Sequence, residues 1–388
     1  MLYRSKRLAS PMSLLIVFGL ILTACQPAAA PTTEAPSGPV EIKIAFFSPL
    51  TGGAAFLGTE QLAFARLAVE DFNKGMAPYH ATLVEEDTDI TPDKAVPVAE
   101  RTAADETILG VVGPAGSGQV EATAEIFETA GLAHVSPSAT RPSLATAGNK
   151  TFFRVVPNDD VQGPTDANYI ADEIGAKNVY VLDDQESYGT NLADTVDKVL
   201  KQKGVTTTRA SVTQADTDFS SLVTTIKGSG AELVFFAGQI PSQGALLAKQ
   251  LKEQGVDIPV FGGDGFFSSK EYIDDAGGAT EGSYASVFFQ DIRGIAEAAD
   301  VAKAADAAFP TWGNFGPPTY AATIVVLEAA VRAHKAGNLS RAGVLAEVAK
   351  TDVKILGVPF KFDQNGEVIG ATFYISQVKD SKFVQVFP

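Results

Sequence analysis

Residues 108–140 are the segment that most constrains how this chain can fold. Residues 108–112 are a short apolar run with β-branched side chains, residues 120–130 place apolar side chains at helical spacing, and residues 132–135 are apolar again. This pattern predicts a strand, a helix and a second strand. Two strands joined through a helix lie parallel in one sheet, and parallel sheets bind ligands beyond the carboxyl ends of their strands.

Two loops of small residues follow these strands, Gly116-Ser117-Gly118 and Ser138-Ala139-Thr140. We expect them side by side at one edge of the sheet, where their hydroxyls and backbone N–H groups suit a small anion such as a carboxylate. The alternative is that the glycines only permit a tight turn. Phosphate is disfavoured, because Gln119-Val120 replace the Lys-Ser/Thr of a Walker loop and the glycines do not form a G-x-G-x-x-G pattern.

Length and charge narrow the class of protein. A chain of 388 residues predicts two domains, and 45% hydrophobic with 20% charged residues is typical of a globular protein with a sizeable core. The formal net charge of −16 argues against nucleic acid as a partner and against electrostatic attachment to anionic lipid.

The N-terminus has the features of an export signal. Residues 1–24 carry three basic side chains and no acid, and the apolar run 14–22 has the length of a signal-peptide core rather than of a membrane-spanning helix. The next residue, Cys25, is the only cysteine, which excludes internal disulfides and a cysteine metal site. Residues 25–39 are rich in Pro, Ala and Thr and predict a disordered tether.

The run Leu22-Thr23-Ala24-Cys25 resembles the bacterial lipobox, in which the cysteine is lipidated after cleavage. We therefore expect lipidation of Cys25 and an extracytoplasmic protein anchored to the cell membrane. The alternative is a buried cysteine in an uncleaved membrane anchor.

The rest of the chain alternates strands and helices in two series. It predicts an α/β fold with two Rossmann-like lobes, each a mainly parallel sheet flanked by helices, joined by a multi-strand hinge. The first lobe is expected to comprise residues 40–157 plus 288–363, and the second residues 158–287 plus 364–388.

Local patterns add three finer expectations. Pro97 could interrupt a helix over residues 92–104. Residues 295–309 predict one alanine-rich helix. Residues 358–362 and 372–378, with Asn365-Gly366 between them, predict a hairpin-like return.

No catalytic set is apparent. The only histidines are His80, His134 and His334; His134 lies in an apolar strand pattern, where a core histidine is expected, and the other two are expected to be solvated. No G-x-S-x-G elbow accompanies them. Asp87-Thr88-Asp89 and Asp183-Asp184 could bind calcium, but no EF-hand loop is present and turn or cap roles are favoured. We expect no enzyme activity, no cofactor and no metal.

Two residues favour recognition of a small molecule instead. Asp264 lies between glycines just after a predicted strand, where its carboxylate is free to point into a cleft, although a simple turn role is the alternative. Tyr188 follows another predicted strand and could cover a ligand from the second lobe or pack on its own helix. A Ser/Thr rim for a carboxylate facing an aspartate for an ammonium group describes a site for a free α-amino acid.

Several short motifs occur in a fixed order along the chain: SPLTG at 48–52, GPAGS at 113–117, HVSPSAT at 134–140, FRVVPND at 153–159, QGP at 162–164, DQESYG at 184–189, DTDF at 216–219 and GGDG at 262–265. With them the chain, from residue 40 to 378, closely resembles the substrate-binding lipoproteins of bacterial ABC importers for branched-chain amino acids. This is the leucine/isoleucine/valine-binding family of the type I periplasmic binding-protein fold.

The resemblance implies how a ligand is held. Ser117, Thr140 and the backbone around Ser138-Ala139 would hold the carboxylate, Asp264 the ammonium group, and Tyr188 would close over the ligand. Leu57 and Gln239 would also contact it, although the family commonly has aromatic residues at these two positions.

The implied mechanism is closure of two lobes around one amino acid, followed by docking on the permease of an importer that is driven by an ATPase subunit. A monomer is expected. Leu, Ile or Val is the first expectation for the ligand, and another small amino acid or an amide is the alternative. A sensor with the same fold and an extracytoplasmic hydrolase using Asp264 as base are the other functions considered.

Overall fold

The computed structural model describes residues 38–146 and 148–388. The predicted signal peptide (1–24), Cys25 and nearly all of the predicted tether (25–39) lie outside these described residues. Within the described ranges, no helix is both long enough and apolar enough to cross a membrane.

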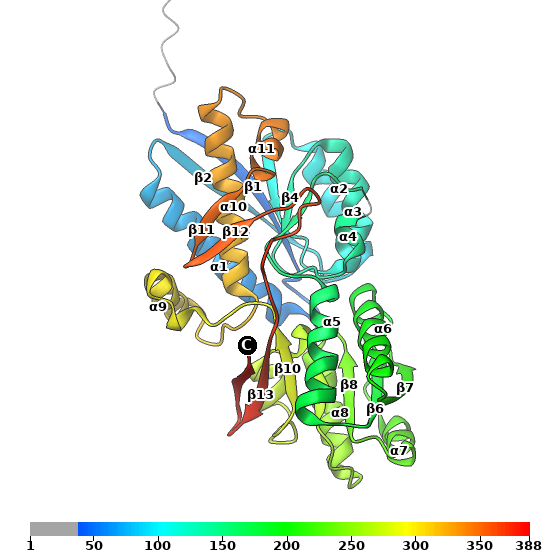
Figure 1. Cartoon of the computed structure of the whole chain (residues 1–388). Coiled ribbons are helices and arrows are strands. Elements are labelled where there is room, and N and C mark those ends of the chain that lie inside the picture. The colour runs from blue at the N-terminus through cyan, green and yellow to red at the C-terminus, as the bar shows by residue number, and fades with distance from the viewer. Residues whose placement is uncertain (1–37, 147) are drawn as a thin grey trace, which may run out of the picture. The chain divides into compact units, whose positions relative to one another are not determined.

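The first sheet has five parallel strands in the order β2-β1-β3-β4-β5 (Figure 1). We call this sheet and the helices packed on it the first lobe. Its strands are β1 Val40–Ser48, β2 Tyr79–Asp87, β3 Ile108–Val112, β4 His134–Ser136 and β5 Phe152–Arg154. Its helices are α1 Ala55–Gly75, α2 Pro92–Ala104, α3 Ser117–Ala130, α4 Ser143–Thr146, α9 Ala299–Ala308, α10 Gly316–Lys335 and α11 Arg341–Val348.

Strand β1 shows why helices cover both faces of this sheet. Its side chains alternate between the faces, and both sets are apolar. Ile44 and Phe46 pack in a cluster with α1 and α10, whereas Ala45 and Phe47 pack in another with α2 and α3. Because all four side chains are fully buried, the strand is held in one register, and the loops that follow β1 and β3 are fixed in place.

The second sheet has seven strands in the order β14-β13-β10-β9-β8-β6-β7, and we call it and its helices the second lobe (Figure 1). The pairs among β6 to β10 are parallel, and β13 runs antiparallel to β10 and β14. The strands are β6 Asn178–Asp183, β7 Thr206–Ser211, β8 Leu233–Ala237, β9 Val260–Gly262, β10 Tyr284–Val287, β13 Tyr374–Lys379 and β14 Lys382–Phe387. The helices are α5 Asp159–Asn168 with a π-helical turn at Tyr169–Ile174, α6 Ser187–Gln202, α7 Ser220–Ser229 and α8 Pro241–Glu253, with a second π-helical turn at Ser269–Asp274.

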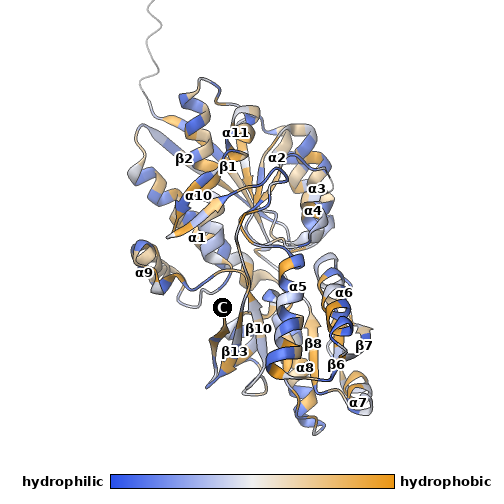
Figure 2. Cartoon of the chain, viewed as in Figure 1, coloured by the Kyte–Doolittle hydropathy of each residue, from blue (hydrophilic) through white to orange (hydrophobic). Residues whose placement is uncertain are grey.

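Figure 2 shows the hydropathy pattern behind this arrangement: β8 is apolar along its length, whereas α5 and α6 alternate hydrophobic and hydrophilic residues. The chain passes between the sheets three times, after β5, after β10 and before β13. The predicted α/β fold with two mainly parallel sheets is confirmed.

The predicted hairpin-like return at residues 358–362 and 372–378 is wrong. Strand β12 (Val358–Lys361) pairs antiparallel with β11 (Asp352–Ile355), while β13 pairs with β10 and β14. The Asn-Gly signal makes only a small local turn, closed by a bridge between Phe362 and Val368. A local turn motif cannot reveal that the chain then leaves for the other sheet.

Two other expectations differ in detail. The helix predicted from residue 295 begins at Ala299, after 3-10 turns at Ile292–Gly294 and Ala296–Ala298. Pro97 lies inside α2 without interrupting it.

Candidate functional site

The candidate site is a cavity between the two lobes, beyond the carboxyl ends of strands from both sheets. The empty space between its lining atoms totals about 330 Å³ when the adjoining open solvent is included. Its lining residues are Leu57, Ile90, Ala115, Gly116, Ser117, Ser138, Tyr188, Gln239, Asp264, Gly265 and Phe315. Six of the eight predicted ligand-binding residues are in this set, and the other two, Ala139 and Thr140, are buried in the loop behind it.

The two predicted small-residue loops lie side by side on the first lobe. The Ser117 hydroxyl, in the first turn of α3, accepts a hydrogen bond from the backbone N–H of Arg141 at 3.2 Å. The Ser138 hydroxyl donates to the Ala115 carbonyl at 2.8 Å and accepts from Gln61 at 2.9 Å. The Ser138 side chain is therefore committed to bonds inside the lobe, and Gln61 is a supporting residue that sequence reasoning missed.

The backbone of the second loop is ordered by Ser136. Its hydroxyl donates to the Pro114 carbonyl at 2.6 Å and accepts from the N–H groups of Ser138 and Ala139 at 3.4 and 3.0 Å. Thr140 differs: its hydroxyl is buried and has no hydrogen-bond partner among the described residues, and none is found for its N–H. In this arrangement Thr140, rather than Ser138-Ala139, offers free groups to a carboxylate.

On the second lobe, Asp264 begins a short 3-10 turn after β9. Its Oδ1 accepts hydrogen bonds from the Tyr188 hydroxyl at 2.6 Å and from Gln162 Nε2 at 2.8 Å. Burial raises the pKa of Asp264 to about 6, although both hydrogen bonds favour its ionised form. The flanking glycines are needed for space, because a Cβ on Gly263 would lie 2.2 Å from the Tyr188 hydroxyl oxygen.

Two further buried acids lie close to Asp264. Burial raises the pKa of Asp159 to about 7 and that of Asp166 well above its usual value, and the charge of Asp264 adds to both shifts. The Thr140 hydroxyl favours the ionised form of Asp159 without meeting hydrogen-bond geometry, and Asn191 donates to the same carboxyl at 2.9 Å. This end of the cavity is therefore rich in negative or ionisable groups and suits a cation.

The remaining wall is largely apolar, with Leu57 from the start of α1, Ile90, and Phe315 at the start of α10. Ile90 has a φ of 51°, a backbone conformation that β-branched residues rarely adopt.

Buried Glu60 accepts from the backbone N–H groups of Phe315 and Gly316 at 2.9 and 2.5 Å. Burial raises the pKa of Glu60 to about 7. Glu60 and Phe315 lie in or at the start of helices and follow no strand end, whereas Ile90 lies in the loop after β2, where the strand-end rule could have indicated it.

Gln239 adds one amide to this wall. Its backbone N–H donates to Asp184 at 3.1 Å, and its side-chain oxygen accepts from Gln214 at 3.4 Å. Burial raises the pKa of Asp184 to about 6.

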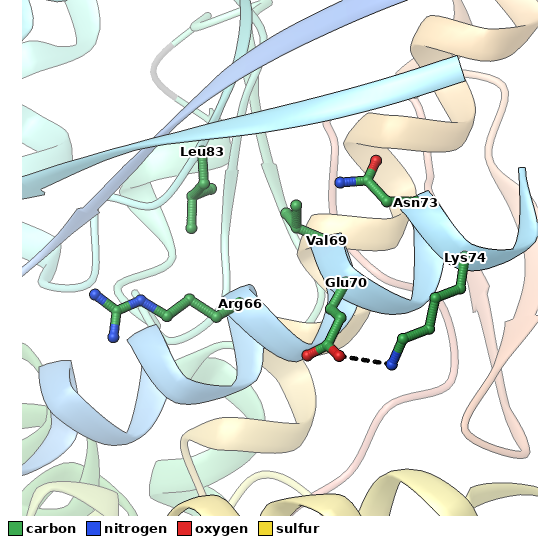
Figure 3. A pocket seen from close by; sticks show the side chains of 6 residues that line it. All are labelled: Arg66, Val69, Glu70, Asn73, Lys74 and Leu83. Atoms are coloured by element: carbon green, nitrogen blue, oxygen red, sulfur yellow. Dashed lines mark ion pairs between the residues drawn. The ribbon is translucent and has the colours of Figure 1, made fainter. Parts of the chain in front are cut away.

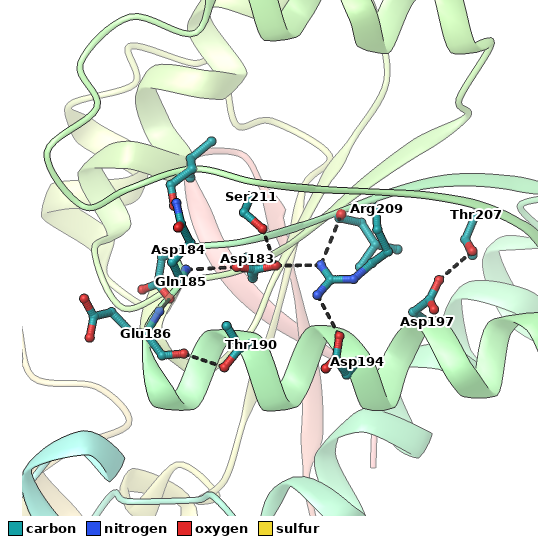
Figure 4. Close-up of polar contacts among 12 residues, drawn as sticks. Asp183, Asp184, Gln185, Glu186, Thr190, Asp194, Asp197, Thr207, Arg209 and Ser211 are labelled. Atoms are coloured by element: carbon teal, nitrogen blue, oxygen red, sulfur yellow. Dashed lines mark hydrogen bonds and ion pairs between the residues drawn. The ribbon is translucent and has the colours of Figure 1, made fainter. Parts of the chain in front are cut away.

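The loop between β6 and α6, just before Tyr188, is supported at the end of β6 (Figure 4). Asp183 accepts from the Gln185 N–H and the Ser211 hydroxyl, both at 2.9 Å, and pairs with Arg209 at 2.8 Å. Asp183 therefore has the turn role that was favoured over calcium binding.

The lobes contact each other beside the site. Arg141 of the first lobe donates to the Ser187 carbonyl at 2.9 Å, and the Ser187 hydroxyl donates to Glu121 at 2.7 Å. Arg141 and Glu121 also pair at 3.1 Å.

A second hollow is a less suitable site. It lies between α1 and β2 (Figure 3), and its charged groups are paired, Lys74 with Glu70 at 2.6 Å and Arg66 with Glu85 at 2.7 Å.

His134 offers no base, since it is buried in the core as expected and burial lowers its pKa to about 3. No group of three or more metal-ligating side chains occurs in the described part of the chain.

Comparison with known proteins gives consistent matches. A family model described as "Periplasmic binding protein" matches residues 41–382. The leucine-, isoleucine-, valine-, threonine-, and alanine-binding protein of Pseudomonas aeruginosa is 33% identical over 341 residues, covering 86% of this chain and 89% of that protein.

Two solved structures share the fold. A leucine binding protein LivK from Thermotoga maritima has a TM-score of 0.82 at 24% identity, covering 89% of this chain and 97% of that chain. The branched-chain amino acid transporter substrate binding protein LivJ from Streptococcus pneumoniae, in complex with isoleucine, has a TM-score of 0.80 at 24% identity, covering 90% of this chain and 100% of that chain.

Proposed function

Because the chain belongs to the periplasmic binding-protein family, a family of binding proteins rather than enzymes, we propose that it captures a free branched-chain amino acid for an ABC importer. The Pseudomonas relative is named for binding leucine, isoleucine, valine, threonine and alanine, and the Streptococcus structure holds isoleucine. These names support the same ligand class here.

One observation carries the proposal: the cavity has complementary groups for the two charged ends of an amino acid. On the first lobe, Ser117 lines the cavity, and the Thr140 hydroxyl and N–H behind it lack protein partners among the described residues. On the second lobe, Asp264 presents a buried carboxylate. A zwitterion pairs both ends at once, whereas a ligand with only one charged end leaves buried polar groups uncompensated, which costs several kcal/mol.

The apolar wall supports an aliphatic side chain on the ligand. Leu57, Ile90 and Phe315 line this part of the cavity, and contact with them removes hydrocarbon from water at about 25 cal/mol per Å². Gln239 is the polar exception and leaves room for a small polar side chain as the alternative.

Binding by lobe closure follows from a site built from both lobes. We propose that residues 40–157 plus 288–363 move as one body and residues 158–287 plus 364–388 as the other, with the three crossing segments as hinge. The closed form would dock on the membrane permease, whose ATPase partner drives import. Lipid on Cys25 would hold the protein at the outer face of the membrane.

A thermal-shift screen of the purified protein against the twenty L-amino acids tests the proposal. A ligand that binds only the folded state raises the melting temperature by mass action, so leucine, isoleucine or valine should give the largest shifts. If none of the twenty shifts the melting temperature, the proposed function is wrong.

A further inference from the structure

The buried guanidinium of Arg154 lies behind the loop that contains Thr140. Arg154 is in β5 and is fully buried. Its Nη1 donates to the carbonyl oxygens of Ala139 at 2.9 Å and Arg141 at 2.8 Å, which are the carbonyls on either side of Thr140. One side chain thus fixes the loop at two points, although it does not line the cavity.

Holding the Ala139 carbonyl also orients the Thr140 N–H. The two groups belong to the same planar peptide unit, and in a trans peptide they point in opposite directions. When Arg154 holds the carbonyl from behind, the Thr140 N–H must point away from Arg154. The neighbouring N–H groups of Ser138 and Ala139 are already bound to Ser136, so Thr140 is the unit whose direction matters for a ligand.

The other half of the guanidinium pairs with Glu367. Arg154 Nε donates to Glu367 Oε2 at 2.7 Å, and Nη2 donates to Oε1 in a bidentate pair. Glu367 lies between β12 and β13, on a segment that crosses from the first sheet to the second. It also accepts from Asn158 at 3.1 Å, the N-cap residue of α5, where another crossing ends.

We propose that Arg154 is a positioning residue for ligand binding, and that Glu367 links it to the hinge. Arg154 aims the Thr140 N–H at the ligand carboxylate, while Glu367 and Asn158 tie the same guanidinium to two of the three crossing segments. A buried ion pair is not needed for stability alone, because well-packed apolar residues are often as stable. The guanidinium donates to two carbonyls beside the site and to a carboxylate in the hinge, so the pair also positions the loop that contains Thr140.

The inference rests on the proposed function for its ligand but has a readout without one. Arg154→Lys keeps the charge but loses the planar fork that reaches two carbonyls and one carboxylate together. Arg341→Lys is the matched control: Arg341 also donates to backbone carbonyls, of Ile108 and Ala103 at 2.9 Å each and of Asp105 at 2.6 Å, but at the amino end of β3, away from the site.

Hydrogen exchange of the ligand-free proteins is measured first. The amides of Ala139 and Arg141, which donate to the Ser136 and Ser117 hydroxyls at 3.0 and 3.2 Å, should exchange at least tenfold faster in Arg154→Lys than in wild type and less than twofold faster in Arg341→Lys. Equal exchange of these two amides in wild type and Arg154→Lys overturns the proposal, whether or not leucine binds.

Calorimetric titration with L-leucine follows. Arg154→Lys should raise the Kd at least tenfold, Glu367→Gln should raise it less, and Arg341→Lys should change it less than twofold. Equal losses in Arg154→Lys and Arg341→Lys would mean that both arginines only stabilise the fold. If the wild type fails to bind leucine, the titration is repeated with the amino acid that gives the largest thermal shift. If no amino acid binds, the proposed function is refuted. The exchange result still decides the role of Arg154 in that case.

Discussion

The Tyr188 hydroxyl donates a 2.6 Å hydrogen bond to Oδ1 of Asp264, although the two residues follow different strands, β6 and β9. Gln162 of α5 donates to the same oxygen. Three elements of the second lobe therefore fix the direction of one buried carboxylate.

Asp264→Ala should greatly weaken binding of L-leucine while leaving the fold intact. Removing one partner of a desolvated charge pair costs about 2–5 kcal/mol, which is about 30-fold to several thousandfold in Kd. Calorimetry measures the loss, and circular dichroism of the variant checks the fold. An unchanged Kd with leucine binding to the parent would refute the role of Asp264.

Tyr188→Phe should weaken leucine binding about tenfold or more. The variant keeps the ring but removes a donor that favours ionised Asp264 and orients it for the ligand ammonium. Part of the contribution of a hydrogen bond to a charged group, about 1.5–3 kcal/mol, is therefore lost from binding. The matched control is Tyr284→Phe, since Tyr284 pairs with Gln377 at 2.8 Å on another part of the second sheet. Similar small effects of the two substitutions would contradict a role of the Tyr188 hydroxyl in orienting Asp264 for the ligand.

Leucine affinity should fall at acid pH. The ligand ammonium favours ionised Asp264, whereas burial raises the pKa of this acid to about 6 without ligand. Below pH 6 a proton must leave before the ion pair forms, so the affinity decreases about tenfold per pH unit and is recovered above pH 7. Calorimetry from pH 5 to 8 measures this, and proton release near pH 6 appears as a buffer-dependent heat.

Asp159 could also titrate in this range, because burial raises its pKa to about 7. Asp159→Asn separates the two contributions. The pH dependence should persist in that variant, and its loss there would assign the effect to Asp159 instead of Asp264.

Glu60→Gln should change the pH dependence of folding. Burial raises the pKa of Glu60 from 4.5 to about 7 in the folded state, so the wild type loses about 3 kcal/mol of unfolding free energy from this group as the pH rises from 4 to 8. Glutamine keeps the acceptor for Phe315 and Gly316 but does not ionise. Urea unfolding should show similar stabilities at pH 4 and a more stable variant at pH 8; equal differences at the two pH values would contradict the assignment.

Cys25→Ala should release the protein from the membrane fraction of cells. Lipidation of Cys25 is the attachment that the lipobox-like run at residues 22–25 favours. Cell fractionation with detection of the folded domain measures this, and a variant that stays with the membrane would show that another attachment exists.

The fold was predictable where the signal is local and repeated. Strand β3 is apolar at every position and α3 follows with helical spacing, so the parallel sheet could be inferred from residues 108–140. The partner of β12 was missed although the signal is local: β11 and β12 form a hairpin through the two-residue turn Leu356-Gly357, where both residues have positive φ, whereas the prediction relied on the Asn-Gly pair after β12.

The residues of the site were likewise predictable only where the sequence signal is local. Ser117, Tyr188 and Asp264 follow strands, and the rule that ligands bind at strand ends placed them at the cavity. Glu60 and Gln162 lie on helices, and Arg154 lies behind a loop, where only packing brings them near the site. The N–H groups of Ser138 and Ala139 donate to the Ser136 hydroxyl instead of remaining free for a ligand, and only the folded chain shows these hydrogen bonds.

The most direct test of the central claim is a calorimetric titration of L-leucine into the purified protein at pH 7.5. Saturable binding of one leucine per chain, lost in Asp264→Ala, is the predicted result. No binding of leucine or of any other L-amino acid would contradict it.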